Sequence, residues 1–295
     1  MLIRHLDFFV TLAEEQHFGR AAELCGVTQP ALSLAIRKLE EDLGATLILR
    51  GKRFMGLTAE GEKVLVWGRQ ILADYGHLRD DLFGRRKGGL TGELRLGVAA
   101  AAMPLVPQLS ARFEAHNPLA RIRFRAMTPP EITAAIRRFE LDGGVTELDP
   151  RPPAGMVAQP IAPGEVLFAC RADHPFAHDA TIPWRDALTQ PLCVAEGGIA
   201  AALAARKLRA SVLCDTLDAV LAHLRHGHWC ALVPGSFRAL LAPGDTVGVH
   251  GLSGAPALSG LGLLLARRDP QAPMVQALMD CAEGWQGGGG GAILS

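Results

Sequence analysis

The stretch that decides the fold of the N-terminal region is Gly19-Arg-Ala-Ala-Glu-Leu-Cys-Gly-Val-Thr-Gln-Pro-Ala-Leu-Ser33. Its first part predicts a short helix over residues 19–24, because small and apolar side chains permit close helix packing. Gly26 can adopt the left-handed conformation that ends a helix, and the Thr28 hydroxyl can cap the next helix. Pro30 costs no hydrogen bond, since first-turn amides have no partner within a helix. The stretch therefore predicts two helices joined by a tight turn.

Apolar residues with helical spacing continue on both sides of this turn. Upstream, one stripe predicts a first helix, and its members are Leu6, Phe9, Val10 and Ala13. Downstream, a second stripe predicts a third helix over about residues 29–43, and its members are Leu32, Ile36, Leu39 and Leu43. The opposite face of this third helix carries Gln29, Ser33 and Arg37.

These three side chains have the chemistry of base recognition. A helix pair with a glycine turn, and short hydrogen-bonding residues early in its second helix, can enter the major groove of DNA. Glutamine reads adenine, arginine reads guanine, and serine suits either. The spacing alone also allows an alternative, a three-helix core packed against the rest of the protein with this face as ordinary surface.

Two short apolar runs around a glycine-containing turn predict a hairpin over residues 46–58. Three of the four residues at its tip are cations, namely Arg50, Lys52 and Arg53. Cations on an exposed hairpin suit DNA phosphates, and a hairpin in this place is a wing. Residues 1–90 carry 13 basic and 12 acidic side chains, so positive charge has to be focused at a few positions. For the hairpin taken alone, a solvated charged turn is the alternative.

A long helix is predicted over about residues 58–83, with Thr58 as its cap. Glu60 and Glu62 lie in its first turn, where negative side chains interact favourably with the positive end of the helix dipole. Apolar residues spaced by 4, 3, 4, 3 and 4 form a heptad seam, consisting of Val64, Gly68, Ile71, Tyr75, Leu78 and Leu82. A separate helix has no core of its own for such a seam, so we expect it to pack against a second copy. The helix would be roughly 40 Å long, enough to separate two DNA-reading modules by about a turn of DNA.

Together these segments resemble the N-terminal region of LysR-type transcriptional regulators. The matching residues are Phe18-Gly-Arg-Ala-Ala-Glu-Leu24, Val27-Thr-Gln-Pro-Ala-Leu-Ser33, Ile36-Arg-Lys-Leu-Glu40, Leu43-Gly44 and Leu57-Thr-Ala-Glu-Gly61. The resemblance implies a winged helix-turn-helix with the wing on the DNA backbone and four residues at the base edges, namely Thr28, Gln29, Pro30 and Ser33. It also implies a homodimer, or a homotetramer as in similar proteins.

Beyond a basic joint at residues 85–89, strand-like runs alternate with helical ones. We expect strands over residues 94–98, 121–125, 156–161, 166–170, 192–194, 211–214, 230–233 and 261–265. We expect helices over residues 104–116, 131–139, 199–208, 217–226 and 274–285. Such alternation predicts parallel α/β sheets covered on both faces, and some 200 residues suggest two lobes with a cleft. LysR-type effector domains look similar, with two lobes resembling periplasmic solute-binding proteins.

Ligands of open α/β sheets bind beyond the carboxyl ends of the strands. The candidate loops are residues 99–104, 127–131, 145–146, 195–199, 215–217 and 234–236. From these loops and Trp229, which would narrow the cleft, we expect an effector site of Ala101, Ala102, Met103, Thr128, Thr146, Gly197, Thr216 and Trp229. In LysR-type proteins, hydroxyls after the first strand and near Thr128 commonly hold a carboxylate. Residues 99–103 have no hydroxyl, which weakens that inference, and the three threonines could instead only cap helices or turns.

Catalytic and metal-binding patterns are weak in this sequence. His223, His226 and His228 straddle a predicted helix end without an acid or thiol at a usual ligand spacing, so we expect no metal site and no cofactor. Asp215 and Ser236 with His228 do not establish a catalytic triad. No G-x-S-x-G elbow, P-loop or G-x-G-x-x-G follows a strand, so we expect no enzyme.

The six cysteines form no C-x-x-C pair and sit mostly in apolar runs, which is typical of reduced core thiols. A redox switch built from the distant pair Cys193 and Cys214 is the alternative. No run reaches the roughly 18 uncharged apolar residues of a membrane helix, and the first 15 residues lack the pattern of a signal peptide. We therefore expect a cytoplasmic protein without a membrane partner.

The chain has 295 residues, 49% of them hydrophobic and 20% charged, with a formal net charge of zero. This composition predicts a multidomain globular protein rather than a disordered chain. We expect a winged helix-turn-helix domain (residues 1–58), a dimerising linker helix with a hinge (59–90), a two-lobed effector-binding domain (91–286) and a flexible glycine-rich tail (287–295). The predicted function is transcriptional regulation, with double-stranded promoter DNA, a small-molecule effector, a second copy and RNA polymerase as partners. A DNA-tethered enzyme and a ligand-independent architectural DNA binder are the alternatives.

Overall fold

The computed structural model describes residues 2–49, 54–87 and 89–283. Its contacts divide the chain into one unit of residues 1–88 and 137–140, and a second unit of residues 89–136 and 141–295. The predicted glycine-rich tail, residues 287–295, lies outside the described residues. Among the helices that the structure describes, none combines the length and apolar character that crossing a membrane requires.

The described part of the first unit contains four helices and the base of a short hairpin, in the predicted order. The helices are α1 (Leu2–Glu15), α2 (Phe18–Leu24), α3 (Gln29–Leu43) and α4 (Ala59–Lys87). The predicted apolar stripes of α1 and α3 meet in its core, where the fully buried side chains include Phe9, Leu12, Leu32 and Leu39. The helix-turn-helix is therefore confirmed, with its second helix at the predicted residues.

Local hydrogen bonds explain where α3 begins and ends. Gly26 in the turn has a φ of +64°, a conformation that costs glycine little. Thr28 Oγ1 accepts a hydrogen bond from the Ala31 amide at 3.4 Å, which is the predicted N-cap. Gly44 has a φ of +65° and ends α3 in the left-handed conformation.

The base of the hairpin is held against α3 and α4. The carboxylate of Glu40 accepts hydrogen bonds from the amides of Leu47 at 2.7 Å and Ile48 at 3.2 Å. Ile48 pairs with Leu57 in an antiparallel bridge. Thr58 Oγ1 donates to the Thr46 carbonyl at 2.6 Å and caps α4 by accepting from the Gly61 amide at 2.9 Å. The cap of α4 thus also fixes the second strand of the wing.

The predicted seam of α4 divides into two parts. Gly68 is buried against α1, since a Cβ at this glycine would lie 3.0 Å from Leu6 Cδ1, and Val64 also packs against the core of the unit. The expectation that the seam has no core of its own to meet is therefore wrong for its first part. The second part is exposed and consists of Ile71, Tyr75, Leu78 and Leu82.

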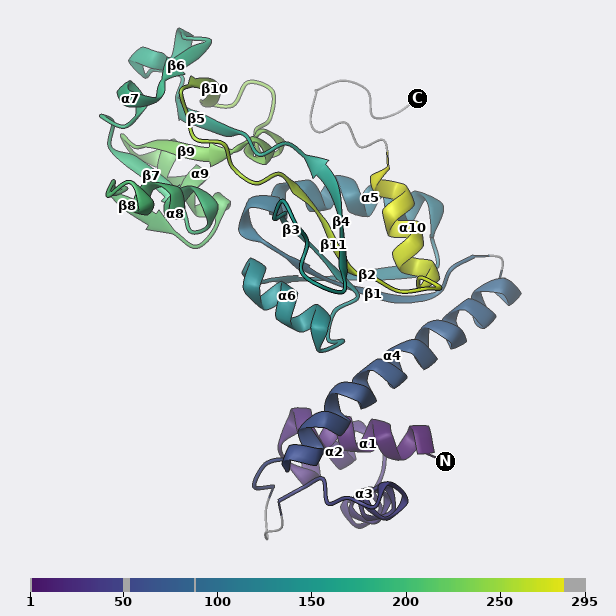
Figure 1. Ribbon diagram of the computed structural model, residues 1–295. Helices are drawn as coiled ribbons and strands as arrows, with labels where there is room; N and C mark the ends of the chain where they lie inside the picture. Colours follow the sequence, from purple (N-terminus) through teal and green to yellow (C-terminus); the bar gives the residue numbers. More distant parts are fainter. Residues whose placement is uncertain (1, 50–53, 88, 284–295) are drawn as a thin grey trace. The chain divides into compact units, whose positions relative to one another are not determined.

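The first lobe of the second unit is a five-stranded sheet with helices on both faces. Its elements are β1 (Gly92–Val98), η1 (Ala100–Leu105), α5 (Val106–His116), β2 (Ala120–Ala126), α6 (Pro129–Arg137), β3 (Gly143–Glu147), β4 (Met156–Ala162), β11 (Leu261–Ala266) and α10 (Pro273–Ala282). The strand order is β2-β1-β3-β11-β4. Helices α5 and α10 cover one face, and α6 covers the other (Figure 1).

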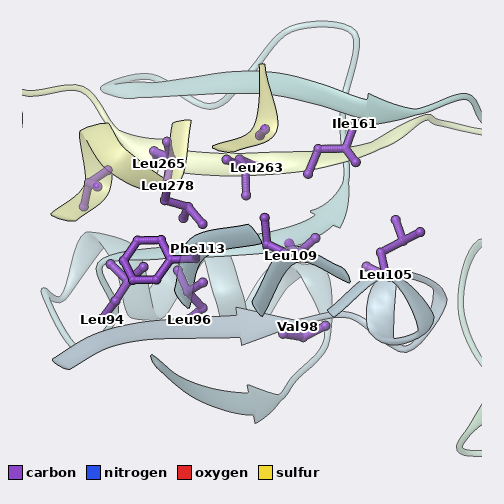
Figure 2. Packing of buried hydrophobic residues seen from close by; sticks show 14 of the residues in the cluster. Leu94, Leu96, Val98, Leu105, Leu109, Phe113, Ile161, Leu263, Leu265 and Leu278 are labelled. Atoms are coloured by element: carbon purple, nitrogen blue, oxygen red, sulfur yellow. The ribbon is translucent and has the colours of Figure 1, made fainter. Parts of the chain in front are cut away.

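The core of this lobe follows from the period of two in β1. Leu94, Leu96 and Val98 point to the same face of the sheet, because alternate residues of a strand share a face. Figure 2 shows them in one cluster with Leu109 and Phe113 of α5. All five side chains are buried.

The second lobe is a six-stranded sheet in the order β6-β10-β5-β9-β7-β8. Its elements are β5 (Val166–Arg171), η2 (Pro175–His178), β6 (Thr181–Pro183), α7 (Trp184–Ala187), β7 (Leu192–Ala195), α8 (Gly198–Ala205), β8 (Val212–Cys214), α9 (Leu217–His226), β9 (Cys230–Pro234), η3 (Gly235–Leu240) and β10 (Val247–Ser253). Helix α9 packs on one face of the sheet, and α7 and α8 pack on the other.

Both sheets are mixed, so the prediction of parallel sheets is wrong in this respect. The chain leaves the first lobe after β4 and returns through β10 to β11 (Figure 1). Strand β11 runs antiparallel to β3 and β4, and β10 runs antiparallel to β5 and parallel to β6. Strand β10 escaped prediction because it contains Gly248 and Gly251, and glycine is depleted in strands. The predicted loop at Val145 and Thr146 is also wrong, since both residues lie inside β3.

The two segments that connect the lobes pack closely against each other. A Cβ at Gly164, between β4 and β5, would lie 2.0 Å from the carbonyl oxygen of Leu258, between β10 and β11. Backbone atoms therefore meet at this crossing without an intervening side chain. Only glycine permits such an approach.

Candidate functional site

The first part of α3 presents the predicted base-reading residues. Thr28, Gln29, Pro30 and Arg37 are exposed, and Ser33 is half-buried. The neighbouring cation Lys38 pairs with Glu41 at 3.4 Å and Asp42 at 3.3 Å. Within the described ranges, no ion pair engages Arg37 in the same way.

The N-terminal end of α3 adds a feature that is independent of side chains. The first amides of a helix have no internal partner and carry partial positive charge, which suits a phosphate or a base acceptor. The Thr28 hydroxyl already satisfies the Ala31 amide. Thr28 therefore positions the helix start, and Gln29 is the first side chain that can reach outward.

One residue on this surface was not predicted. Leu34 is 68% exposed and follows Pro30 by one helical turn. A signal was present in the sequence, because Leu34 falls outside the buried stripe of Leu32, Ile36 and Leu39. An exposed apolar side chain at this place can contact the methyl group of thymine.

The three predicted wing cations, Arg50, Lys52 and Arg53, lie outside the described residues. Only the base of the wing is described, where the Leu49 amide donates to the Gly56 carbonyl at 3.0 Å. The contribution of the three cations to phosphate binding stays a prediction.

In the second unit, several of the predicted effector loops meet where the two lobes touch. Strands β7, β8 and β9 are parallel, so the residues after their carboxyl ends lie at one edge of the sheet. Ser236 Oγ donates a hydrogen bond to the carbonyl of Ala101 in the other lobe at 2.5 Å. Glu147 Oε1 lies 3.7 Å from the Cβ position of Gly197, which has a φ of +131°. We call these four residues the lobe junction.

The lobe junction includes two predicted residues, Ala101 and Gly197, and two that were missed. Glu147 ends β3 and is half-buried, and Ser236 is the second residue of η3, which follows β9, and is buried. Sequence reasoning placed residues 234–236 in a candidate loop without selecting Ser236. Glu147 was missed because its strand was not predicted.

Three other predicted effector residues, Ala102, Thr146 and Thr216, have internal roles. Ala102 is fully buried in the core of the first lobe, whereas the neighbouring Met103 is half-buried. Thr146 is buried in β3, and its hydroxyl donates to Glu147 Oε2 at 3.4 Å. Thr216 Oγ1 accepts from the Ala219 amide at 3.2 Å and caps α9. Thr216 therefore has the alternative role, that of a helix cap.

Thr128 is exposed, but its polar groups are engaged by a carboxylate of its own chain. Both the amide and the hydroxyl of Thr128 donate to Glu131 Oε2 at 2.8 Å. These two hydrogen bonds hold the pKa of Glu131 below its ordinary value. A ligand carboxylate at Thr128 would have to displace Glu131.

The structure does not bring Trp229 together with the other predicted effector residues. Strand β9 is parallel to β7, and Cys230 pairs with Leu192 at the amino end of both strands. Trp229 precedes β9 and thus lies at the opposite end of the strand from Gly197. Its indole stacks on the ring of His228 at a centroid distance of 4.5 Å.

Comparison with known proteins agrees with these features. A family model described as a bacterial regulatory helix-turn-helix protein of the lysR family matches residues 3–62. A second model, the LysR substrate binding domain, matches residues 87–286.

Individual relatives are regulators. The transcriptional regulator XapR of Escherichia coli is 32% identical over 184 residues, covering 61% of this chain and 62% of that protein. The regulator AlsR of Bacillus subtilis is 32% identical over 196 residues, covering 65% of this chain and 63% of that protein. The matched region thus spans slightly less than two thirds of the length of these relatives.

Solved structures show the same fold over nearly the whole chain. A full-length OxyR variant of Pseudomonas aeruginosa superimposes with a TM-score of 0.74 and 25% identity, covering 96% of this chain and 95% of that one. CbnR in a complex with its target DNA superimposes with a TM-score of 0.64 and 23% identity, covering 96% of this chain and 99% of that one.

Proposed function

The chain belongs to the LysR family of bacterial transcriptional regulators, and on this premise we propose that it binds promoter DNA sequence-specifically through α3 and responds to a small-molecule effector. The observation that carries the DNA-binding proposal is the exposed early surface of α3, with Gln29 at its start and Arg37 unpaired among the described residues. Membership of a family of regulators gives the alternative of a DNA-tethered enzyme no support.

Each residue of this surface has a distinct proposed task. Gln29 reads an adenine edge, Arg37 a guanine edge, and the half-buried Ser33 either base at closer range. Pro30 and Leu34 offer apolar contact to a thymine methyl group. Thr28 orients the helix start, while Arg50, Lys52 and Arg53 of the wing neutralise phosphates.

We propose that two copies bind together. Three segments of each copy divide the work. Residues 1–58 read DNA, residues 59–90 pair the copies and connect the DNA-binding domain to the effector domain, and residues 91–286 bind the effector. The exposed part of the α4 seam supports pairing, since Ile71 and Tyr75 are 44% and 46% exposed without covering an internal core. A dimer would read two half-sites of an interrupted palindrome, and a tetramer would pair two dimers. The proposed setting is the cytoplasm, with RNA polymerase as a partner.

The DNA-binding proposal can be tested with Gln29→Ala. A duplex preferred by the native chain is first selected from a random pool, and binding to every single-base variant is then measured. The substitution is expected to erase the preference at one base pair, equivalent to about 1–3 kcal/mol, because a two-bond contact to one base is lost. Affinity for unrelated duplexes should stay unchanged, since Gln29 carries no charge.

The matched control is Glu41→Ala, an exposed position near the other end of α3. It should leave the base preference intact at every position. If Gln29→Ala weakens all duplexes to the same extent, Gln29 does not read a base.

The lobe junction is the proposed effector site, together with the half-buried Met103. The hydroxyl of Thr128 is engaged by Glu131, whereas Glu147 presents a half-buried carboxylate at the junction. We therefore propose an effector that donates hydrogen bonds, such as an amine, amide or hydroxyl compound. Such a ligand can switch transcription only if it binds two lobe arrangements with different affinity.

Thermal unfolding with a panel of amines, amides and polyols tests the effector site. A compound at 100 times its dissociation constant should stabilise the native chain by about 2.7 kcal/mol. Glu147→Gln should reduce this stabilisation, while Glu114→Gln on the exposed surface of α5 should not. Stabilisation that survives Glu147→Gln unchanged would place the ligand elsewhere, and a panel without effect would favour the architectural alternative.

A further inference from the structure

Three side chains that can bind a metal ion converge beneath α9 in the second lobe. Cys193 lies in β7, Cys214 is the last residue of β8, and His223 lies on α9. The two sulfur atoms are 3.6 Å apart, and Cys214 Sγ lies 3.8 Å from His223 Nδ1. Within the part of the chain that the structure describes, these residues form the group whose ligand atoms all lie within 4.8 Å of one another.

The distances agree with those around a bound ion. Zinc binds cysteine sulfur at about 2.3 Å and histidine nitrogen at about 2.1 Å, so tetrahedral geometry separates two sulfurs by about 3.8 Å and sulfur from nitrogen by about 3.6 Å. The sulfur–sulfur separation and that between Cys214 and His223 differ from these values by only about 0.2 Å. Cys193 Sγ lies within 4.8 Å of the His223 ligand atom. We propose that Cys193, Cys214 and His223 bind one thiophilic metal ion, of the class of Zn²⁺ or Cu⁺.

The geometry of the two cysteines fits a disulfide bond less well than it fits a metal ion. The register of β7 and β8 places Ala195 opposite Cys214, so Cys193 is its diagonal neighbour. Strands about 4.8 Å apart with a rise of about 3.3 Å per residue put diagonal Cα atoms about 8 Å apart. Disulfides require Cα atoms within about 7 Å, so closure would demand movement of one strand.

The surroundings favour a soft ion over Mg²⁺ or Ca²⁺. Two thiolates and an imidazole are ligands of zinc and copper, whereas magnesium and calcium prefer oxygen. Both cysteines are buried in an apolar cluster that includes Leu217, Val220 and Phe237. Burial raises the pKa of Cys193 to about 12, so the thiol is protonated without an ion and binding releases its proton to solvent.

His223 connects this buried pair to solvent, since its side chain is half-buried. In the metal-free chain, its Nδ1 donates a hydrogen bond to the Ala219 carbonyl at 2.7 Å. Binding through Nδ1 would replace this bond and leave the ring proton on Nε2. The ion would then join β7, β8 and α9 two residues from the cap of α9 at Thr216.

The test uses the full chain, reduced and kept anaerobic. Zn²⁺, Cu⁺ and Mg²⁺ are titrated separately against a chelator of known affinity, and bound metal is counted by elemental analysis. One equivalent of Zn²⁺ or Cu⁺ per chain is expected, with the tighter of the two identifying the ion. Cys214→Ala and His223→Leu should each lower the affinity at least about tenfold, by comparison with losses caused by outer-shell changes.

Two matched controls accompany these variants. Cys170→Ala removes an equally buried thiol from the opposite face of the same sheet, and His226→Leu removes the exposed histidine of the same helix. Neither should change affinity. Should Cys214→Ala fail to fold, the half-buried His223→Leu decides, with circular dichroism verifying its fold.

Three results would overturn the proposal. The first is the absence of a stoichiometric ion in the reduced chain, and the second is an equal loss of affinity in Cys170→Ala. The third is a Cys193–Cys214 disulfide, detected by peptide mapping after mild oxidation, because it would show that the strands move enough for redox chemistry.

Discussion

Replacing Gly61 by alanine is expected to abolish specific DNA binding while leaving the second unit folded. Gly61 lies in the first turn of α4, where the helix backbone touches the wing. A Cβ at this position would meet the Leu47 carbonyl oxygen at 2.1 Å and Leu57 Cβ at 3.2 Å. That carbonyl accepts the Thr58 amide at 3.0 Å, so it cannot move without opening the hairpin. We expect a loss of about 3 kcal/mol, the upper part of the range for overpacking.

The same substitution at Gly76 is the control. This glycine lies on the same helix, and no atom beyond its chain neighbours and the adjacent helix backbone lies within 4 Å of its Cβ position. Alanine there should stabilise α4 by about 0.5–1 kcal/mol, since it reduces the freedom of the unfolded chain. Calorimetry of both variants, together with binding to the selected duplex, measures the contrast. If the two substitutions have effects of the same sign and size, the close approach of helix and wing is wrong.

Replacing Asp142 by alanine is expected to destabilise the first lobe by about 2 kcal/mol, because hydrogen bonds to a charged group are lost. The Arg95 guanidinium is 36% exposed, so water can replace part of what it loses. The Asp142 side chain is 3% exposed and accepts three hydrogen bonds from Arg95 of β1. One comes from the Arg95 amide at 2.8 Å, and two come from its guanidinium at 3.2 and 2.9 Å. Removal of the carboxylate takes this acceptor away from both the backbone amide and the guanidinium of Arg95.

Glu93→Ala is the matched control in the same sheet. Glu93 pairs with Arg123 across β1 and β2, but the two side chains are 35% and 64% exposed. Water and salt screen such a pair, so its loss should barely alter unfolding. Denaturant unfolding of the two variants at low and high salt measures the difference. Equal losses of unfolding free energy would mean that burial does not determine how much these ion pairs stabilise the lobe.

Most of the DNA-binding unit could be predicted from sequence because its decisive interactions are local. Thr28 caps α3 through an amide three residues away, and Gly26 and Gly44 end helices through their own backbone conformations. The buried stripes of α1 and α3 follow from the 3.6-residue period. The packing partner of the α4 seam is harder to predict, since its heptad spacing does not tell whether Gly68 packs against its own chain or against a second copy.

The effector region was predicted less well because its composition depends on contacts between distant segments. Ser236 reaches Ala101 across 135 residues, and no local pattern marks that pair. Thr146 was expected in a loop because the glycines before it conceal β3. Trp229 is expected from sequence to narrow the cleft, whereas the structure puts it before β9, at the opposite end from Gly197. The direction of β9 in its sheet cannot be read from its own residues.

The sequence by itself determined the helix-turn-helix, the starts and ends of its helices, the family resemblance and the two-lobed α/β class. These depend on residues within a few positions of one another, whose hydrogen bonds and periodicities form in the same way wherever the segment lies. Only the tertiary structure decided the strand order, the lobe junction and the meeting of Cys193, Cys214 and His223. Those depend on strand register and on the path of the chain between lobes, which are set by the packing of whole layers.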